Sequence, residues 1–385
     1  MKWLVILLSL LLSGPALADG ISGQGAGDEG LTGMIGTGAG IVPPLNNLPS
    51  PAIMLDFVNN VGTVFGSSGT AASFVTVTRT TTNGSATNLM PTSASGVSYT
   101  TYGNNVPRFT SAGLLVEQAR NNYFPNSNAP VTAATNTLPV GPIIMWVNGS
   151  GSAAATAGTG TGCSGTATQG TPATWTMSVG GTCTITVTGS LNAVQVENPT
   201  SGQTPGIPTS FIVTTTSIGQ RALDSVATTG TLLGTIGTSY TIAARAVPNG
   251  ATTYNTQQTI VSPDDTTVNN RTVLFRTPTT NVAALTNTGT NGVTALNPTG
   301  ATAVPQSTPT SIAAANTINS QMLVQGGLYV GSNTAAYTPP GPALARILIG
   351  TQAGASASPL LGSIAWVKMW PQTALTQSQL LAITQ

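Results

Sequence analysis

Residues 104–127, NNVPRFTSAGLLVEQARNNYFPNS, bring together Arg108, Glu117 and Arg120. Only 5% of the 385 residues are charged, against about 25% in an ordinary soluble domain. Because the chain uses charge so sparingly, a cluster of three charged residues is not explained by solubility. We expect a structural ion pair in which a buried Glu117 is held by Arg108 or Arg120, next to an apolar strand at residues 114–116.

The order and spacing of this stretch resemble a segment of phage tail-fibre and head-spike proteins. That segment reads N-x-P-R-F, then G-L-L-I-E-x-A-R-T-N-L, then N-S. Here Asn121 stands in place of the family's Thr, Asn122 keeps its Asn, and Tyr123 replaces its Leu. The resemblance covers about twenty residues and implies a fibre or spike protein that assembles as a homo-oligomer, most often a trimer.

Two later segments resemble the same proteins, in the same order. Residues 194–197 and 207–212 resemble Q-x-E-x-G followed by P-T-S-Y-I-P-T, with Phe211 for the Tyr and Val213 for the Pro. Residues 221–224, RALD, are similar to the motif that closes that domain. We therefore interpret residues 126–224 as a β-sandwich of the carbohydrate-binding-module kind.

The amino-terminal residues 1–18 have the pattern of a signal peptide. Lys2 precedes an apolar run at residues 3–12, and the segment ends in Ala16-Leu17-Ala18, so cleavage is expected after Ala18. The alternative, a membrane anchor, needs about 20 apolar residues. No later stretch approaches that length, so we expect no membrane insertion and a secreted, extracellular or periplasmic protein, or a virion protein if a phage encodes it.

The remaining sequence predicts an all-β fold of two β-sandwich (jelly-roll) domains. The 45 Gly and 26 Pro, with abundant Thr, Ser and Asn, favour strands and tight turns. Residues 19–50 read as a flexible Gly/Pro-rich arm or linker. Residues 51–125 read as a small amino-terminal β module, and residues 225–385 as a second sandwich, with strands expected at 321–330 and 346–350 among others.

The end of the chain resembles concanavalin-like (laminin-G-like) jelly rolls. There, I-L-I-G is followed by G-x-I leading into an apolar strand and then by A-L-T-x-x-Q-L. Thr376 and Gln379 have the spacing of a capping box, which predicts a helix over the residues that follow.

Between the two cysteines, Cys163 and Cys183, lies the segment ATWTMSV, which is followed by Gly180-Gly181, and Cys183 opens a second segment that reads as a strand. Two strands joined by a Gly-Gly turn bring the two sulfurs close, and export supplies an oxidising environment, so a disulfide is expected. Two free buried thiols are the alternative. A metal site is disfavoured because the chain has no His.

The residue types available also limit the chemistry. Without His, the Ser-His-Asp and Cys-His types of catalysis have no base, and the nine carboxylates lack the E-x-D-x-x-E spacing of concanavalin-like glycosidases. Asp264 and Asp265 form the best oxygen-rich loop, which is either a calcium site or a plain turn. No other cofactor is implied. A net charge of +1 and the lack of a Gly-rich phosphate loop give no support for nucleic-acid or nucleotide binding.

Trp366 and Trp370 are the candidate ligand-binding residues. Strict alternation along the strand 364–370 places Ile364, Trp366, Lys368 and Trp370 on one face. Tryptophan faces can stack on sugar rings, although filling a core is the commoner use of the residue.

The sequence therefore predicts a non-enzymatic binding protein, similar to phage fibre or spike proteins and acting as an adhesin for glycans or cell-envelope surfaces. The alternatives are a purely structural fibre or surface component without a ligand, and a degenerate glycoside hydrolase.

Overall fold

The structure of the protein is a computed structural model. The residues it describes are 48–79, 87–88, 100–101, 105–199, 208–229, 232, 234–248, 257–278, 280, 282–289, 292–296, 303–334, 338–354 and 359–385. All of them belong to one compact unit, Pro43–Gln385. The predicted signal peptide 1–18, its cleavage after Ala18 and most of the predicted arm 19–50 lie outside the described residues. No helix in the described part of the chain is long and apolar enough to cross a membrane.

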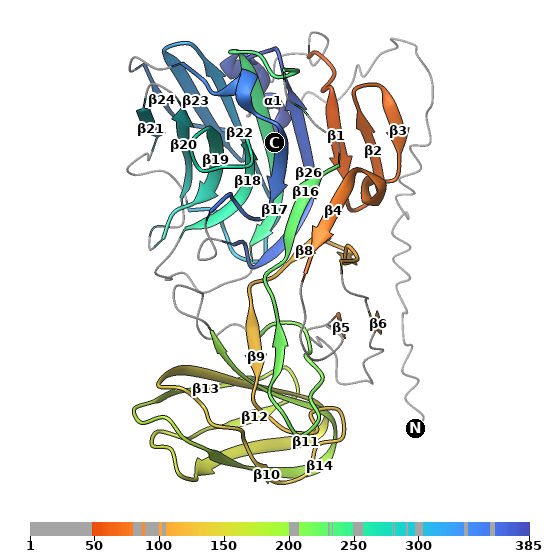
Figure 1. Ribbon diagram of the computed structural model, residues 1–385, viewed down its shortest axis with the longest axis vertical. Helices are drawn as coiled ribbons and strands as arrows, with labels where there is room; N and C mark the ends of the chain where they lie inside the picture. Colours follow the sequence, from red (N-terminus) through yellow and green to blue (C-terminus); the bar gives the residue numbers. More distant parts are fainter. Residues whose placement is uncertain are drawn as a thin grey trace, which may run out of the picture. The chain divides into compact units, whose positions relative to one another are not determined.

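The predicted all-β fold class is confirmed, since sheets make up most of the described chain (Figure 1). The largest sheet has ten strands, and β26 lies between β17 and β1 near its middle. Its members are β1 (Ile53–Asp56), β2 (Val61–Val64), β3 (Ser67–Gly69), β7 (Phe109–Thr110), β8 (Gly113–Val116), β17 (Tyr240–Pro248), β22 (Thr310–Thr317), β23 (Ser320–Gln325), β24 (Leu328–Asn333) and β26 (Gly362–Trp370).

A seven-stranded sheet packs against it to form the jelly roll. It runs in the order β21-β20-β19-β18-β25-β16-β4. Its members are β4 (Val75–Thr78), β16 (Ser225–Thr228), β18 (Gln258–Asp264), β19 (Arg271–Arg276), β20 (Ala283–Gly289), β21 (Gly292–Leu296) and β25 (Arg346–Ile349). One apolar core takes side chains from both sheets, such as Leu55 and Ile242 from the first and Val261 and Leu285 from the second.

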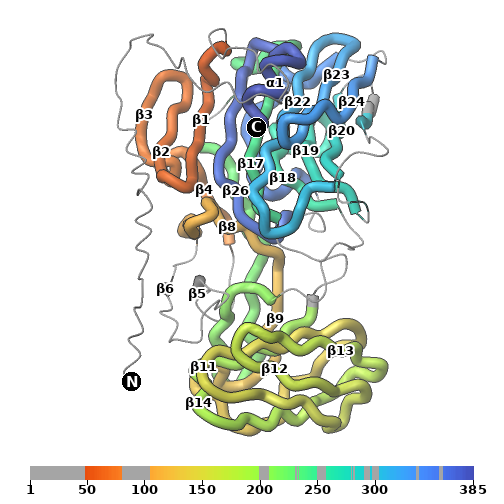
Figure 2. Tube along the Cα trace, turned by 180° about the vertical axis from the view of Figure 1, so that it is seen from behind, coloured from red at the N-terminus to blue at the C-terminus, as the bar shows by residue number. Residues whose placement is uncertain are grey.

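The strand pairing crosses the predicted domain boundaries. Residues 51–125 do not pair only among themselves, because β1 pairs with β26 and β4 pairs with β16. The physical reason is that each of these four-residue strands buries alternate side chains, and a few short strands cannot cover such a face alone. The jelly roll is thus built from strands on both sides of the inserted segment, and Figure 2 shows β1 beside β26 from the opposite side.

The inserted segment forms its own seven-stranded sheet, ordered β12-β11-β14-β9-β15, with β10 on β14 and β13 on β11. Its members are β9 (Arg120–Asn122), β10 (Ala133–Ala134), β11 (Gly141–Ala157), β12 (Thr166–Thr168), β13 (Ala173–Met177), β14 (Cys183–Pro199) and β15 (Gly219–Arg221). The two long strands pair along their whole length with a register shift at Asn148/Gly149. Side chains from both halves of β11, including Ile143 and Ala153, enter one core. A separate two-stranded pair joins β5 (Thr87–Asn88) to β6 (Thr100–Thr101).

The disulfide in this inserted sandwich confirms the predicted Cys163–Cys183 bond, with sulfurs 2.05 Å apart.

The strand predicted at residues 321–330 is wrong as a single strand. Gly326 and Gly327 have positive φ angles of 54° and 73°, which glycine adopts without strain. They turn the chain between β23 and β24, and these two strands pair with each other.

One α-helix is found among the described residues, α1 (Gln377–Ile383). The predicted capping box is present, with the Thr376 hydroxyl accepting from the Gln379 backbone and the Gln379 side chain accepting from the Thr376 backbone. Leu380 of α1 belongs to a small apolar cluster with Ala243, Ala313 and Trp370. The helix therefore covers part of the outer face of the ten-stranded sheet and leaves the rest of that face to the candidate site.

Candidate functional site

Strand β26 carries both predicted Trp candidates, and a bulge in it decides which way they point. Consecutive residues of β17 pair with Trp366 and Ile364, so Ala365 has no partner on β17. Such a bulge reverses the alternation of side chains. Trp366 and Trp370 therefore lie on the outer face, whereas Ile364 enters the jelly-roll core. The predicted placement of Ile364 on the Trp face is wrong for this reason.

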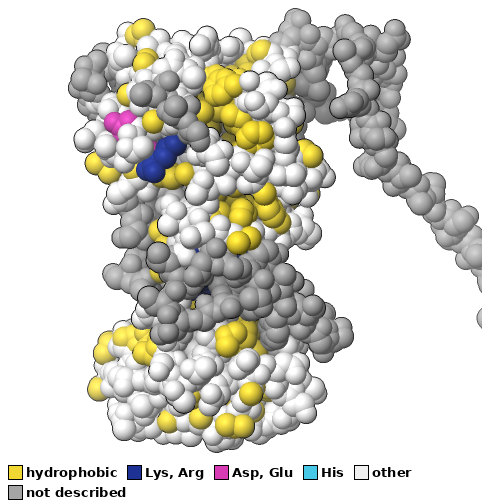
Figure 3. Space-filling model, turned by 45° about the vertical axis from the view of Figure 1, so that its right-hand side comes forward, with side chains coloured by type: hydrophobic (Ala, Val, Ile, Leu, Met, Phe, Trp, Pro, Cys, Tyr) yellow, Lys and Arg dark blue, Asp and Glu magenta, His cyan; other side chains and the backbone are white. Residues whose placement is uncertain are grey.

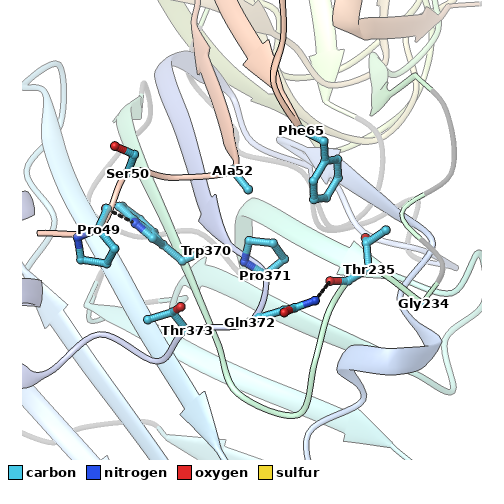
Figure 4. Close-up of a pocket in the computed structure, with 10 residues that line it drawn as sticks. All are labelled: Pro49, Ser50, Ala52, Phe65, Gly234, Thr235, Trp370, Pro371, Gln372 and Thr373. Carbon is cyan, nitrogen blue, oxygen red and sulfur yellow. Dashed lines mark hydrogen bonds between the residues drawn. The ribbon is translucent and has the colours of Figure 1, made fainter. Parts of the chain in front are cut away.

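A hollow of about 530 Å³ lies at the Trp370 end of β26. Figure 4 shows the side chains around it, which come from the amino-terminal end of the described chain, the β2–β3 turn, the loop before β17 and the segment after β26. None of them carries a charge. The lining residues are Pro49, Ser50, Ala52, Phe65, Gly234, Thr235, Trp370, Pro371, Gln372 and Thr373.

Phe65 is the unusual member of this lining. It is 43% exposed and forms the two-residue turn between β2 and β3 with Gly66, at φ angles of 46° and 82°. Positive φ at both positions is the requirement of a type I′ turn, which normally selects Asn-Gly. A bulky aromatic side chain in this conformation is strained. An exposed and strained Phe that lines a hollow is a feature that packing does not explain.

Trp370 contributes less to the hollow than the sequence predicted. It is only 2% exposed, and its indole Nε1 donates to the Pro49 carbonyl at 2.6 Å (Figure 4). Its ring packs in the apolar cluster under α1. Trp370 therefore supports the wall of the hollow and has no open face for stacking.

A second hollow, of about 290 Å³, lies at the Trp366 end of β26. Its floor is a row of side chains on three adjacent strands, because Trp366 is the register partner of both Asp56 on β1 and Arg245 on β17. A carboxylate, an indole and a guanidinium thus stand side by side. The complete lining is Asp56, Val58, Asn59, Ser111, Ala112, Arg245, Val247, Pro309, Ala365 and Trp366.

Lys368 lies over the Trp366 ring, with Nζ 4.6 Å from the ring centroid. Burial lowers the pKa of Lys368, and the negative charge of Asp56 opposes that shift. Trp366 therefore contacts Lys368 and also lines the hollow, whereas Lys368 itself is not part of the lining.

Charge is scarce elsewhere on the surface. Figure 3 shows a face on which Lys, Arg, Asp and Glu side chains occupy little of the area and hydrophobic side chains form several separate patches.

The cluster in residues 104–127 belongs to a buried ionic network. Arg108 contacts Glu117 at 2.6 Å and Asp224 at 2.5 Å. Asp224 also pairs with Arg79, and Glu117 with Arg221 at 3.4 Å. Of the two partners predicted for Glu117, Arg108 therefore holds it, whereas Arg120 lies 3.5 Å from Glu197 instead. All of these side chains are buried, at the point where the chain passes between the jelly roll and the inserted sandwich.

The network keeps Glu117 ionised. Burial acts to raise the pKa of Glu117, but the charges of Arg221 and Arg108 and the hydrogen bonds from Ser210 outweigh burial and lower the pKa to about 2. Burial lowers the pKa of Arg120 to about 10, although Glu197 opposes it. Every acid in the network has a basic partner within it, which fits the predicted structural ion pair.

The low pKa of Glu117 predicts loss of stability in acid. An ordinary Glu has a pKa of about 4.3. Because the folded pKa is lowered to about 2, the stability that Glu117 supplies is complete above about pH 4.3 and is lost as the pH falls toward 2. We expect the urea midpoint to fall between pH 5 and pH 2, and to fall less in Glu117→Gln. If the urea midpoint fell with pH equally steeply in the wild type and in Glu117→Gln, Glu117 would not be the source of the acid sensitivity.

Of the predicted calcium ligands, Asp264 is the last residue of β18 and Asp265 begins the turn that leads to β19. Asp264 accepts from Arg346 Nε at 2.7 Å and from the Thr266 backbone. Asp265 accepts from Thr267 and Asn270 in its own loop. No group of three or more His, Cys, Asp or Glu that could hold a metal occurs among the described residues, and calcium binding at this turn stays a prediction.

Sequence reasoning did not single out Phe65, Asp56 or Arg245. A signal was present for two of them. Phe65-Gly66 occupies the position where a hairpin usually has Asn-Gly, and Arg245 is the only charge in the strand YTIAARAVP. The row that joins Arg245 to Asp56 had no local signal, because nearly 190 residues separate them in the chain.

Comparison with known proteins identifies no relative by sequence. No protein-family model matches the chain, and no curated protein matches it.

Several solved structures are similar to part of the chain. The CBM40 of the Ruminococcus gnavus IT-sialidase, bound to α2,3-sialyllactose, is 17% identical with a TM-score of 0.33, over 38% of this chain and 83% of that one. Domain 4 of AbnA, a GH43 extracellular arabinanase from Geobacillus stearothermophilus, in complex with arabinotriose, is 17% identical with a TM-score of 0.35, over 42% and 73%. The NanB sialidase of Streptococcus pneumoniae is 13% identical with a TM-score of 0.32, over 39% and 24%.

These values are too low to assign a family or a ligand to this chain. The resemblance to phage tail-fibre and head-spike proteins stays a prediction.

Proposed function

We propose that this protein binds a polysaccharide or glycoconjugate without cleaving it, and that the hollow beside Phe65 takes a neutral sugar unit. The observation that carries the proposal is the exposed ring of Phe65, held at a positive φ over an uncharged hollow. Strain of this kind persists only where the surrounding structure enforces it, and it concentrates at binding sites.

The chemistry of the lining supports a neutral saccharide. Sugar-binding pockets combine an aromatic surface with a few placed polar groups. Phe65 and Pro371 supply the apolar surface, and the hydroxyls of Ser50 and Thr373 supply donors and acceptors. The Thr235 hydroxyl donates to the Leu232 carbonyl and can still accept. These groups match the hydroxyls of a sugar, and the absence of charge from the lining disfavours an ionic ligand.

Binding without turnover is supported by the lack of a pair of carboxyl groups in the lining of either hollow. Glycoside hydrolysis usually needs two carboxyl groups flanking the scissile bond. The larger hollow is lined by no carboxylate and the smaller one by Asp56 alone.

The decisive experiment is a glycan array on the wild-type protein, followed by calorimetry with the best ligand on Phe65→Gly. Glycine relieves the strain at this φ, so the variant should fold at least as stably. Its affinity should fall about tenfold or more, since an aromatic side chain buries a large apolar area against a ligand. Tyr329→Ala is the matched control, because Tyr329 is 45% exposed and lines neither hollow.

An array with no bound glycan would favour the purely structural alternative. Unchanged affinity in Phe65→Gly would move the site away from this hollow. New reducing ends released from any bound polysaccharide would favour the degenerate hydrolase.

The biological setting is proposed from the sequence alone. The signal-like residues 1–18 support a place outside the cytoplasm, and the resemblance to phage fibre and spike proteins supports an adhesin that assembles with itself, most often as a trimer. In that setting weak glycan binding by each copy would add up through multivalency.

A further inference from the structure

We propose that the smaller hollow is a second binding site, and that it takes a carboxylate-bearing sugar unit such as a hexuronic acid. The proposal stands on the charged row Asp56–Trp366–Arg245 and does not require the larger hollow to bind a ligand.

Arg245 is the group that points to an anion. The other eight residues of β17 are buried, and Arg245 alone is exposed. Its guanidinium makes no hydrogen bond or ion pair with any described residue, whereas Arg79, Arg108, Arg221 and Arg346 all pair with carboxylates. In a chain this poor in charge, an unpaired Arg lining a hollow is the natural partner of a ligand carboxylate, which its planar fork binds through two parallel hydrogen bonds.

Asp56, the other charged residue of the lining, and Lys368, which lies outside the lining, already have partners. Asp56 Oδ1 accepts from the backbone N–H groups of Val58 and Asn59 at 3.0 Å each, and Oδ2 accepts from Asn59 Nδ2 at 2.7 Å. Lys368 lies over the Trp366 ring, 4.6 Å from its centroid, and is not part of the lining of the hollow. Arg245 is therefore the positively charged residue of the lining that is available to a ligand.

The arrangement also selects among anions. Asp56 retains acceptor capacity, so it can accept from sugar hydroxyls but would repel a doubly charged phosphate. A monoanionic sugar acid satisfies both ends of the row, with its carboxylate on Arg245, its ring against Trp366 and its hydroxyls toward Asp56. The volume of 290 Å³ lies at the lower end of ligand pockets, which run from about 300 Å³ upward, and suits a single sugar unit.

The test compares an oligogalacturonate with the same oligosaccharide after reduction of its carboxyl groups to alcohols. Calorimetry on the wild-type protein should show binding of the acid form at least about tenfold tighter, as expected for one charge-assisted pair. Higher salt should weaken this preference. Arg245→Gln should remove the preference and leave the melting temperature unchanged, because the side chain is exposed.

Arg271→Gln is the matched control, since Arg271 lies on the other sheet, where it donates to the Ala353 carbonyl. Trp366→Ala should weaken both forms, and because Trp366 is half-buried the result counts only where the melting temperature is retained. Equal wild-type affinity for the two forms, or a preference that survives in Arg245→Gln, would overturn the proposal. Phe65→Gly should leave the preference for the acid form intact. Failure of the proposed function at the larger hollow can therefore be distinguished from failure of this proposal.

Discussion

Replacing Glu117 with alanine should lower the free energy of unfolding by about 3–5 kcal/mol, the usual cost of breaking a buried ion pair. The Glu117 carboxylate contacts Arg108 at 2.6 Å and Arg221 at 3.4 Å. It also accepts from the Ser210 backbone at 2.7 Å and from the Ser210 hydroxyl at 2.5 Å. The variant strands a buried Arg221 without a carboxylate in contact and leaves Ser210 without its acceptor, and both groups lie out of reach of water.

Urea unfolding followed by circular dichroism measures this loss. Asp265→Ala is the matched control, because that carboxylate bonds only within its own loop and its removal should cost far less. Glu117→Gln should fall between the two, since it keeps the shape and loses the charge. A midpoint in Glu117→Ala equal to that of Asp265→Ala would show that the network does not stabilise the fold.

The local features of the fold were predictable and the pairing of distant strands was not. Alternation in the segments of β1 and β4 marks them as strands with one buried face. It carries no information on partners, and β1 finds its partner in β26, about 300 residues later. The capping box at Thr376 could be predicted from the sequence because its interactions span only three residues.

The candidate site was predictable only in part, for the same reason. The two Trp residues of β26 could be named from the sequence, but the bulge at Ala365 arises from pairing with β17. Burial of Trp370 depends on α1 and on Pro49. Interactions between residues close in the sequence could therefore be predicted, whereas interactions that depend on which strands pair could be found only in the structure.

The two proposed sites lie along one strand, β26, so a single polysaccharide chain can contact both. Trp366 and Trp370 are four residues apart on β26, or roughly 13 Å at the rise of a strand. The half-buried Met54 and Lys368 lie between the two hollows on the same face. A polysaccharide with alternating neutral and acidic units could therefore engage both hollows at once, and its affinity would exceed that for either unit alone.

The second large effect is expected from loss of the disulfide in the inserted sandwich. The Cys163–Cys183 bond closes a loop with a sequence separation of 20 residues, for which the chain-entropy model gives about 3 kcal/mol. Cys183 is fully buried at the start of β14, and Met177 lies beside both sulfurs. The double variant Cys163→Ala/Cys183→Ala should therefore unfold at a clearly lower urea concentration, and the wild-type protein with reductant should unfold at about the same concentration as the variant.

The position of Trp residues allows this loss to be assigned to one sandwich. Trp175 donates from Nε1 to the Met177 sulfur at 3.3 Å, next to the disulfide, whereas Trp366 lies on β26 of the jelly roll. In the double variant, fluorescence from Trp175 and from Trp146, which lies on β11 of the same sheet, should change at lower urea than in the wild type. Replacing both residues with Phe should abolish that early change. Unfolding at the same urea concentration with and without the bond would show that the loop is held by its strand pairing alone. An early transition that survives when both Trp175 and Trp146 are replaced with Phe would place the loss outside the inserted sandwich, because the disulfide constrains only strands of that sheet.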